Sequence, residues 1–199
     1  MYLKCKNITE SFKTFQQSRI TGGTEAPKHS SPWQTAFVID NQGFCGGSLT
    51  FKNYVLTAGH CTSHDPVNDV GVVRLSALAI VNSYVQVVPL ANSRSGKFNN
   101  VFATVSGWGR TTDDSWYLSP VLMRVNLTTI ENMICQIQVL RLKAVIRNTN
   151  ICTTGCGTKG GCNGDSSGAL ISYDVHIGIV SFGGTECRRG TPSVFIREE

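Results

Sequence analysis

Short runs of apolar residues alternate with polar and glycine-containing turns along most of this chain. The runs have the length of β-strands, and β-branched and aromatic residues are frequent in them. Strands are predicted at residues 33–39, 44–50, 54–57, 70–75, 101–107, 121–130, 151–154, 169–172, 176–182 and 193–197. Residues 131–140 favour a helix, with the carboxylate of Glu131 in its first turn. The polar segment 92–100 reads as a connector, and the whole pattern is typical of an all-β sandwich or barrel.

The composition fits a compact globular protein with a substantial core. The chain has 199 residues, of which 41% are hydrophobic and 16% charged. Its net charge is +5, but Lys and Arg are scattered, so they indicate solvated faces and no nucleic-acid partner. No apolar run is long enough to span a membrane, so we expect no membrane partner either.

Eight cysteines in a chain of this length indicate an oxidising compartment, so we expect a secreted, extracellular protein. Residues 1–19 are polar and read as a propeptide, without the apolar core of a signal peptide. Asn7-Ile8-Thr9 and Asn126-Leu127-Thr128 match the acceptor pattern for asparagine-linked glycosylation. Cys152, Cys156 and Cys162 could be read as zinc ligands, but no fourth ligand is suitably spaced, so we expect no metal and no cofactor.

The strongest chemical signal is the loop Cys162-Asn163-Gly164-Asp165-Ser166-Ser167-Gly168. A serine held between glycines and an acid can be presented beside backbone N–H groups that stabilise a developing oxyanion. Taken alone, the same residues are also typical of an ordinary turn.

Two further motifs supply the groups that would activate such a serine. Thr57-Ala58-Gly59-His60-Cys61 follows an apolar run, and Asn68-Asp69-Val70 opens another. A neutral imidazole is the usual base for a serine hydroxyl, and a carboxylate fixes its tautomer. The chain order His60, Asp69, Ser166 is that of the chymotrypsin type of triad.

At these residues the chain resembles the chymotrypsin-like, trypsin-fold serine endopeptidases. The resemblance runs from Arg19 to about Arg197, and it is most similar to the arthropod chymotrypsin and collagenase-like digestive branch. It includes Arg19-Ile20-Thr21-Gly22-Gly23, Cys45-Gly46-Gly47-Ser48-Leu49, Ser106-Gly107-Trp108-Gly109, Gly178-Ile179-Val180-Ser181-Phe182-Gly183 and Thr191-Pro192-Ser193-Val194-Phe195.

The resemblance implies two antiparallel Greek-key β-barrels with the active site between them. The peptidase domain would occupy residues 20–199, with halves at about 20–95 and 96–199. Gly164 and Ser166 would form the oxyanion hole. The implied disulfides are Cys45–Cys61, Cys135–Cys152 and Cys162–Cys187, which leaves Cys5 and Cys156 either paired together or with one of them free.

The resemblance also implies an activation site and a specificity pocket. A trypsin-like protease would cut Arg19-Ile20, and the new amine of Ile20 would pair with Asp165. Gly160, Gly183 and Ser193 would line the pocket, although the floor could fall at Lys159 instead of Gly160. With no acid among these residues, we expect cleavage after large apolar or aromatic residues.

The chain departs from the family in ways that bear on activity. Only eight residues separate His60 from Asp69, where the family has two further strands, and no C-terminal helix follows the last predicted strand. We therefore expect an incomplete first barrel. The expected partners are polypeptide substrates, an activating trypsin-like protease and protein protease inhibitors, and the expected state is a monomer. The alternative is an impaired or incomplete protease-fold protein that acts only by binding.

Overall fold

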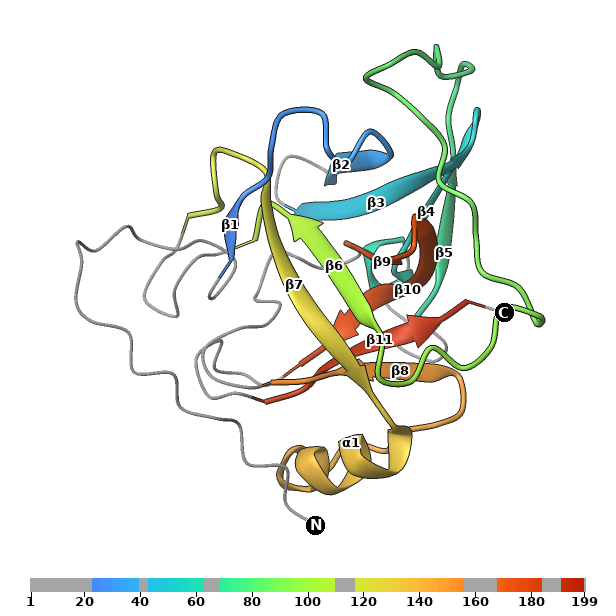
Figure 1. The fold of residues 1–199 in the computed structure, drawn as a ribbon. Coiled ribbons are helices and arrows are strands. Elements are labelled where there is room, and N and C mark those ends of the chain that lie inside the picture. The colour runs from blue at the N-terminus through green and yellow to red at the C-terminus, as the bar shows by residue number, and fades with distance from the viewer. Residues whose placement is uncertain are drawn as a thin grey trace.

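The structure is a computed structural model that describes residues 23–39, 43–62, 69–109, 117–155, 168–183 and 191–198. Nearly all of its regular structure is β-strand, as Figure 1 shows. The strands are β1 Thr24–Glu25, β2 Gln34–Ile39, β3 Gly43–Phe51, β4 Tyr54–Thr57, β5 Gly71–Arg74, β6 Phe102–Gly107, β7 Met123–Ile130, β8 Asn150–Thr153, β9 Ala169–Ser172, β10 Val175–Phe182 and β11 Ser193–Arg197. The helices are α1 Asn132–Val139 and the short 3₁₀ helices η1 Gly59–Cys61 and η2 Leu140–Leu142.

The second half of the chain forms a closed barrel. Six strands follow one another in the antiparallel order β7-β6-β9-β10-β11-β8, and β7 pairs with β8 to close the ring. Closure leaves the ring without free edges, which protects its backbone hydrogen bonds from water. β1 adds to this sheet by pairing with β7, so the start of the described chain lies against the second half.

The first half forms an open four-stranded antiparallel sheet in the order β2-β3-β4-β5. It lies above the barrel in Figure 1. Among the described residues, neither β2 nor β5 has a further strand on its outer edge. The prediction of an all-β fold with an incomplete first barrel is therefore confirmed.

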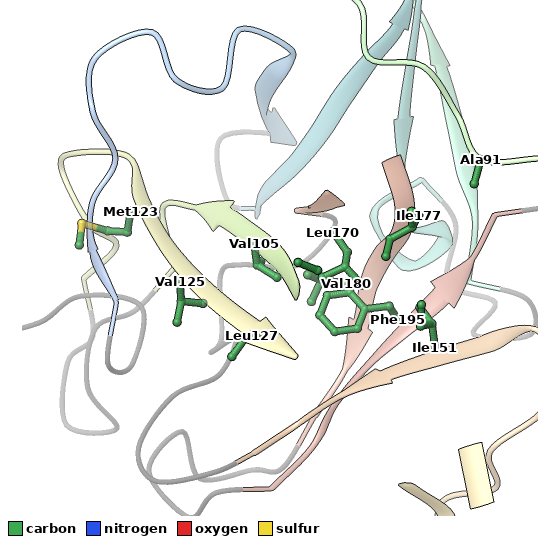
Figure 2. Close-up of a cluster of buried hydrophobic side chains, with 11 residues drawn as sticks. Ala91, Val105, Met123, Val125, Leu127, Ile151, Leu170, Ile177, Val180 and Phe195 are labelled. Carbon is green, nitrogen blue, oxygen red and sulfur yellow. The ribbon is translucent and has the colours of Figure 1, made fainter. Parts of the chain in front are cut away.

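The main core fills the interior of the closed barrel. Phe195, Leu170 and Ile177 are almost completely buried there, and Figure 2 shows them with Val105 among the side chains of this cluster. Burial alternates along β7, with Val125 and Leu127 inward and Asn126 outward, because successive side chains of a strand point to opposite faces.

The predicted strands agree with the observed ones to within a few residues, but two features differ. β1 was not predicted, because its two residues lie in a polar stretch and owe their strand geometry to pairing with β7. Glu131 is the residue preceding α1, in an extended conformation, and it makes no side-chain cap hydrogen bond. Its carboxylate therefore lies one residue before the first turn that was predicted for it.

A strap of irregular chain, which includes Val88 and Pro89, connects the two halves before β6. The N–H of Val88 donates to the carbonyl of Leu49 on β3, at 2.9 Å. One residue further on, the N–H of His176 on β10 donates to the carbonyl of Pro89, also at 2.9 Å. This strap therefore holds β3 and β10 together through backbone hydrogen bonds.

Candidate active site

The ladder between β4 and β5 brings His60 and Asp69 to the same end of the open sheet. Thr57 at the end of β4 pairs with Gly71 at the start of β5. His60 lies three residues after Thr57, on η1, and Asp69 lies two residues before Gly71. The short connection between them therefore does not separate the two side chains.

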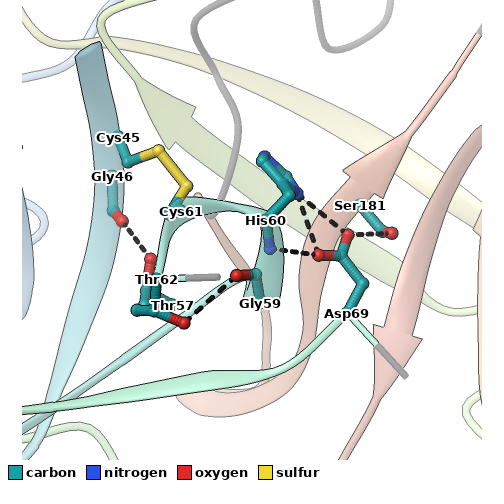
Figure 3. A network of polar contacts seen from close by, with 9 residues as sticks. All are labelled: Cys45, Gly46, Thr57, Gly59, His60, Cys61, Thr62, Asp69 and Ser181. Carbon is teal, nitrogen blue, oxygen red and sulfur yellow. Dashed lines mark hydrogen bonds and ion pairs between the residues drawn. A yellow bond between two sulfur atoms is a disulfide. The ribbon is translucent and has the colours of Figure 1, made fainter. Parts of the chain in front are cut away.

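The carboxylate of Asp69 holds His60 by three contacts, as Figure 3 shows. The ring Nδ1 of His60 lies 2.9 Å from Oδ1 and 3.1 Å from Oδ2 of Asp69, and the backbone N–H of His60 donates to Oδ1 at 2.9 Å. The hydroxyl of Ser181, on β10 of the closed barrel, donates to Oδ2. Asp69 is thus fixed by groups from both halves of the molecule.

Burial and charge differ between the two partners. The side chain of Asp69 is 7% exposed and that of His60 is 36% exposed. The hydrogen bond that the His60 ring donates to Asp69 raises the pKa of His60, burial opposes this, and the negative charge of Asp69 adds to the rise. Burial acts to raise the pKa of Asp69, but hydrogen bonds from the His60 ring, Ser181 and the His60 amide outweigh it, so this pKa is lowered. The carboxylate form of Asp69 is therefore favoured beside His60.

Two glycines allow this close approach. A Cβ atom on Gly59 would lie 3.1 Å from the nitrogen of Val70 and 3.2 Å from the Cα of Asp69. A Cβ on Gly71 would lie 2.7 Å from Oγ1 of Thr62 and 3.0 Å from the carbonyl oxygen of Ala58. A side chain at either position would push η1 away from the start of β5, and His60 away from Asp69.

A disulfide fixes η1 to the sheet. Cys61, directly after His60, is bonded to Cys45 on β3, one of the pairings that the family resemblance implied. Next to it, Thr57 donates a buried hydrogen bond of 2.9 Å to the carbonyl of Gly46. The sulfurs of Cys45 and Cys61 lie near His60, but because they form a disulfide they are not available as thiolate ligands for a metal.

Two residues predicted to line the specificity pocket face each other. A Cβ on Gly183 would lie 3.9 Å from the carbonyl oxygen of Pro192 and 4.0 Å from the Cα of Ser193. Ser193 is buried and pairs in register with Thr153 of β8. The second described disulfide, Cys135–Cys152, joins α1 to β8 on this side of the barrel.

Most of the other predicted site residues lie outside the described residues. These are Cys5, Arg19, Ile20, Cys156, Gly160, Cys162, Gly164, Asp165, Ser166 and Cys187. Gly168 is the first described residue after Ser166, and its carbonyl accepts a 3.0 Å hydrogen bond from the N–H of Val180. Val180 precedes Ser181, so the end of the serine loop is attached beside the residue that binds Asp69.

No local sequence pattern indicated Ser181 as a partner of Asp69, since 112 positions separate them. Ser181 lies in the stretch Gly178 to Gly183, which carries part of the family resemblance, but that resemblance was not used to assign a partner to Ser181. The pattern Gly59-His60 with Asp69-Val70-Gly71 could have indicated the close packing of the two segments.

Comparison with known proteins identifies the family to which this fold and this His60–Asp69 contact belong. The family model described as Trypsin matches residues 20–67 and 63–199. Brachyurin of Leptuca pugilator is 31% identical, over 89% of this chain and 93% of its own length. Chymotrypsin of Phaedon cochleariae is 32% identical, over 89% of this chain and 78% of its own length. The chain therefore belongs to the trypsin family of serine endopeptidases.

Solved structures support the same fold. The structure of HL collagenase superimposes with a TM-score of 0.78 at 27% identity, covering 89% of this chain and 93% of the other. Neuropsin, a serine protease of mouse brain, also gives a TM-score of 0.78, at 23% identity over 88% of this chain and 93% of its own. In the part of the chain that the structure describes, no helix is long and apolar enough to cross a membrane.

Proposed function

We propose that this chain hydrolyses peptide bonds with Ser166 as nucleophile, His60 as general base and Asp69 as the group that orients His60. The observation that carries the proposal is the contact of His60 with Asp69, held from both halves of the molecule. Ser166 precedes Gly168 by two residues, a span of about 7 Å when extended, and Gly168 is attached beside Ser181.

The geometry suits proton transfer to and from a serine. Asp69 engages Nδ1 of His60, which favours the tautomer with its proton on Nδ1 and leaves Nε2 as the base. His60 would accept the Ser166 proton as its oxygen attacks the carbonyl, then donate it to the leaving amine. Asp69 would stay ionised, in keeping with its lowered pKa, and stabilise the imidazolium. The N–H groups of Gly164 and Ser166 would bind the oxyanion.

Pocket composition supports cleavage after large apolar or aromatic residues. Gly183 leaves room opposite Ser193, and neither residue carries a charge to pair with Lys or Arg. Matched peptide substrates that differ only in Phe, Leu or Arg before the scissile bond would test this. Gly183→Val should strongly lower the rate of cleavage after Phe, because the Phe side chain must enter the pocket. The same variant should have much less effect on labelling of Ser166 by a small reagent, which does not need the pocket.

Activation by a trypsin-like protease at Arg19-Ile20 completes the proposal. The freed amine of Ile20 would pair with Asp165, whose carboxylate would otherwise be costly to bury. Secretion would supply the oxidising compartment that the disulfides require. Treatment with trypsin should strongly increase the rate of peptide hydrolysis by the parent protein. The variant Arg19→Gln, which cannot be cut at this site, should show no such increase.

The second candidate function is binding without catalysis, favoured by the open first sheet. One experiment separates the two functions: the protein is cut with trypsin and treated with a fluorophosphonate that labels activated serines. Labelling that is lost in Ser166→Ala supports the enzyme. If folded, cut protein is unlabelled but still retains a macromolecular protease inhibitor, the binding function holds instead.

A further inference from the structure

One glycosylation motif of the sequence lies on an exposed strand face outside the candidate active site. Asn126 is exposed on β7, between the buried residues Val125 and Leu127. Thr128, the hydroxyl residue of the motif, is on the same face, because side chains two residues apart point the same way. The acceptor amide and the hydroxyl are thus both on the outer face of the barrel.

The amide of Asn126 is held by its oxygen only. Thr104 lies opposite Asn126 in the β6–β7 register, and its hydroxyl donates to Oδ1 at 2.9 Å. Among the described residues, no hydrogen bond from Nδ2 of Asn126 is found. The atom to which a glycan would be attached therefore remains available while the amide plane is fixed.

A hollow of about 280 Å³ adjoins this amide. Its lining includes Asn126, Thr104 and two strongly exposed aromatic residues, Phe102 at 79% and Tyr173 at 78%. Tyr173 lies in the two-residue turn between β9 and β10, where positive φ angles at Tyr173 and Asp174 are typical of a tight type I′ hairpin. The hollow therefore presents aromatic rings beside the acceptor amide, and apolar ring faces of this kind can contact a sugar.

We propose that Asn126 carries an asparagine-linked glycan whose first N-acetylglucosamine lies in this hollow, against Phe102 and Tyr173. The glycan donor would be a lipid pyrophosphate-linked oligosaccharide. Nδ2 of Asn126 forms a bond to the anomeric carbon and loses one proton, and the carbon–oxygen bond to the pyrophosphate breaks. The lipid pyrophosphate leaves with the bonding electron pair. The proposal rests on secretion of the chain and does not depend on catalysis.

The attachment is tested in the full chain, expressed behind a secretory leader in glycosylating eukaryotic cells. Release with peptide-N-glycosidase in ¹⁸O water should leave labelled aspartate at position 126. Asn126→Gln and Thr128→Ala should each remove one glycan, whereas Thr128→Ser, which preserves the motif, should retain it. Secreted protein with an unmodified Asn126 peptide would overturn the proposal. The added leader ensures that the chain enters the secretory pathway, and labelling of Ser166 is measured separately. An unmodified Asn126 would therefore contradict the glycan proposal without bearing on the protease function.

The position of the first sugar is tested by trimming. An endoglycosidase that leaves one N-acetylglucosamine should preserve the Tm of the glycosylated protein. Complete absence of the glycan in Asn126→Gln should lower the Tm by about 2–4 °C. The variant Phe102→Val with Tyr173→Asn, which preserves the strand and the turn, should abolish this difference. Equal Tm values for trimmed and glycan-free protein would refute the contact with the hollow.

Discussion

The two halves of the molecule share a strand-rich sequence but differ in closure. The second half closes six strands around a core that includes Phe195, Leu170 and Ile177. The first half is an open sheet of four strands, and each strand exposes a large hydrophobic side chain, at Val38, Phe51, Tyr54 and Val72. The half that carries His60 and Asp69 therefore buries less of its own apolar surface than the other half.

The open half obtains its order by contact with the closed barrel. Leu56 and Ala58 share a buried cluster with Ile179 of β10. Gln34 on β2 accepts a 2.8 Å hydrogen bond from the hydroxyl of Ser106 on β6. Ser181 binds Asp69 near one end of β10. An incomplete sheet can therefore still hold His60 against Asp69 when the closed barrel beside it supplies support.

A buried polar cluster makes a further connection near the other end of β10. Nε2 of His176 lies 3.1 Å from the hydroxyl of Ser48 on β3, and its Nδ1 lies 2.6 Å from Oε1 of Glu198. The second contact has the distance of an ion pair but lacks hydrogen-bond geometry. Ser48 and His176 are almost fully buried, so this cluster joins the two halves away from solvent.

The largest expected effect comes from breaking the contact at Asp69. Asp69→Asn should lower kcat for peptide hydrolysis by about 10⁴-fold, because the amide favours the wrong tautomer of His60. Asp174→Asn, at an exposed carboxylate in a turn, is the control and should leave kcat unchanged. A variant at Asp69 with more than a tenth of the parent activity would contradict the assigned role.

Matched phenylalanines sharpen the contrast in packing. Phe195→Ala in the closed barrel should cost about 3–5 kcal/mol in the free energy of unfolding, because the side chain is only 1% exposed. Phe51→Ala in the open sheet, at 61% exposure, should cost less than about 0.5 kcal/mol. Denaturant unfolding of both variants measures the difference, and equal costs would show that the two halves are equally well packed.

The close approach of η1 to β5 is tested at Gly71. Gly71→Ala would place a methyl group 2.7 Å from Oγ1 of Thr62 and displace the segment that carries His60. A displacement of about 1 Å should lower kcat/KM roughly 100-fold. Adding Thr62→Ala should restore part of the activity, since it removes the nearest clashing atom. Unchanged kcat/KM in Gly71→Ala would mean that the segment carrying His60 can move without loss of activity.

The buried cluster between the halves should contribute less than the core. Ser48→Ala removes the hydroxyl partner of His176 and should destabilise the protein by about 1–3 kcal/mol. Thr50→Ala, at a hydroxyl on the same strand outside this cluster, serves as the control and should stay within about 0.5 kcal/mol of the parent. The free energy of unfolding measures both, and identical values would rule out a stabilising role for the cluster.

The smallest expected effect is a shift in the pKa of His60. Because Asp69 raises the pKa of His60, NMR titration should place the imidazole above its ordinary value of 6.5, and Asp69→Asn should move it down. The stabilising contribution of this interaction is full below pH 6.5 and is lost as pH rises through the folded pKa. Activity should change in the opposite direction, since only neutral His60 acts as a base. A higher pKa in Asp69→Asn would contradict this account.

Local sequence determined much of the fold. Short apolar runs bounded by polar and glycine-containing turns located the strands of both halves, because strands that pack in a core are short and rich in apolar residues. This pattern missed β1, a two-residue strand that only its pairing with β7 defines. The short span between His60 and Asp69 predicted an incomplete first barrel, which the open sheet confirms.

The sequence by itself identified the family and the residue types of the candidate site, because the motifs around His60, Asp69 and Ser166 are local and specific. The roles of these three residues remain predictions. Only the tertiary structure decided that His60 and Asp69 still meet, and that Ser181 and His176 join the open half to the barrel. The physical reason is that Asp69 is held by Ser181, 112 positions away, and that His176 contacts Ser48, 128 positions away. Local patterns do not encode such contacts, which arise when the two sheets pack together.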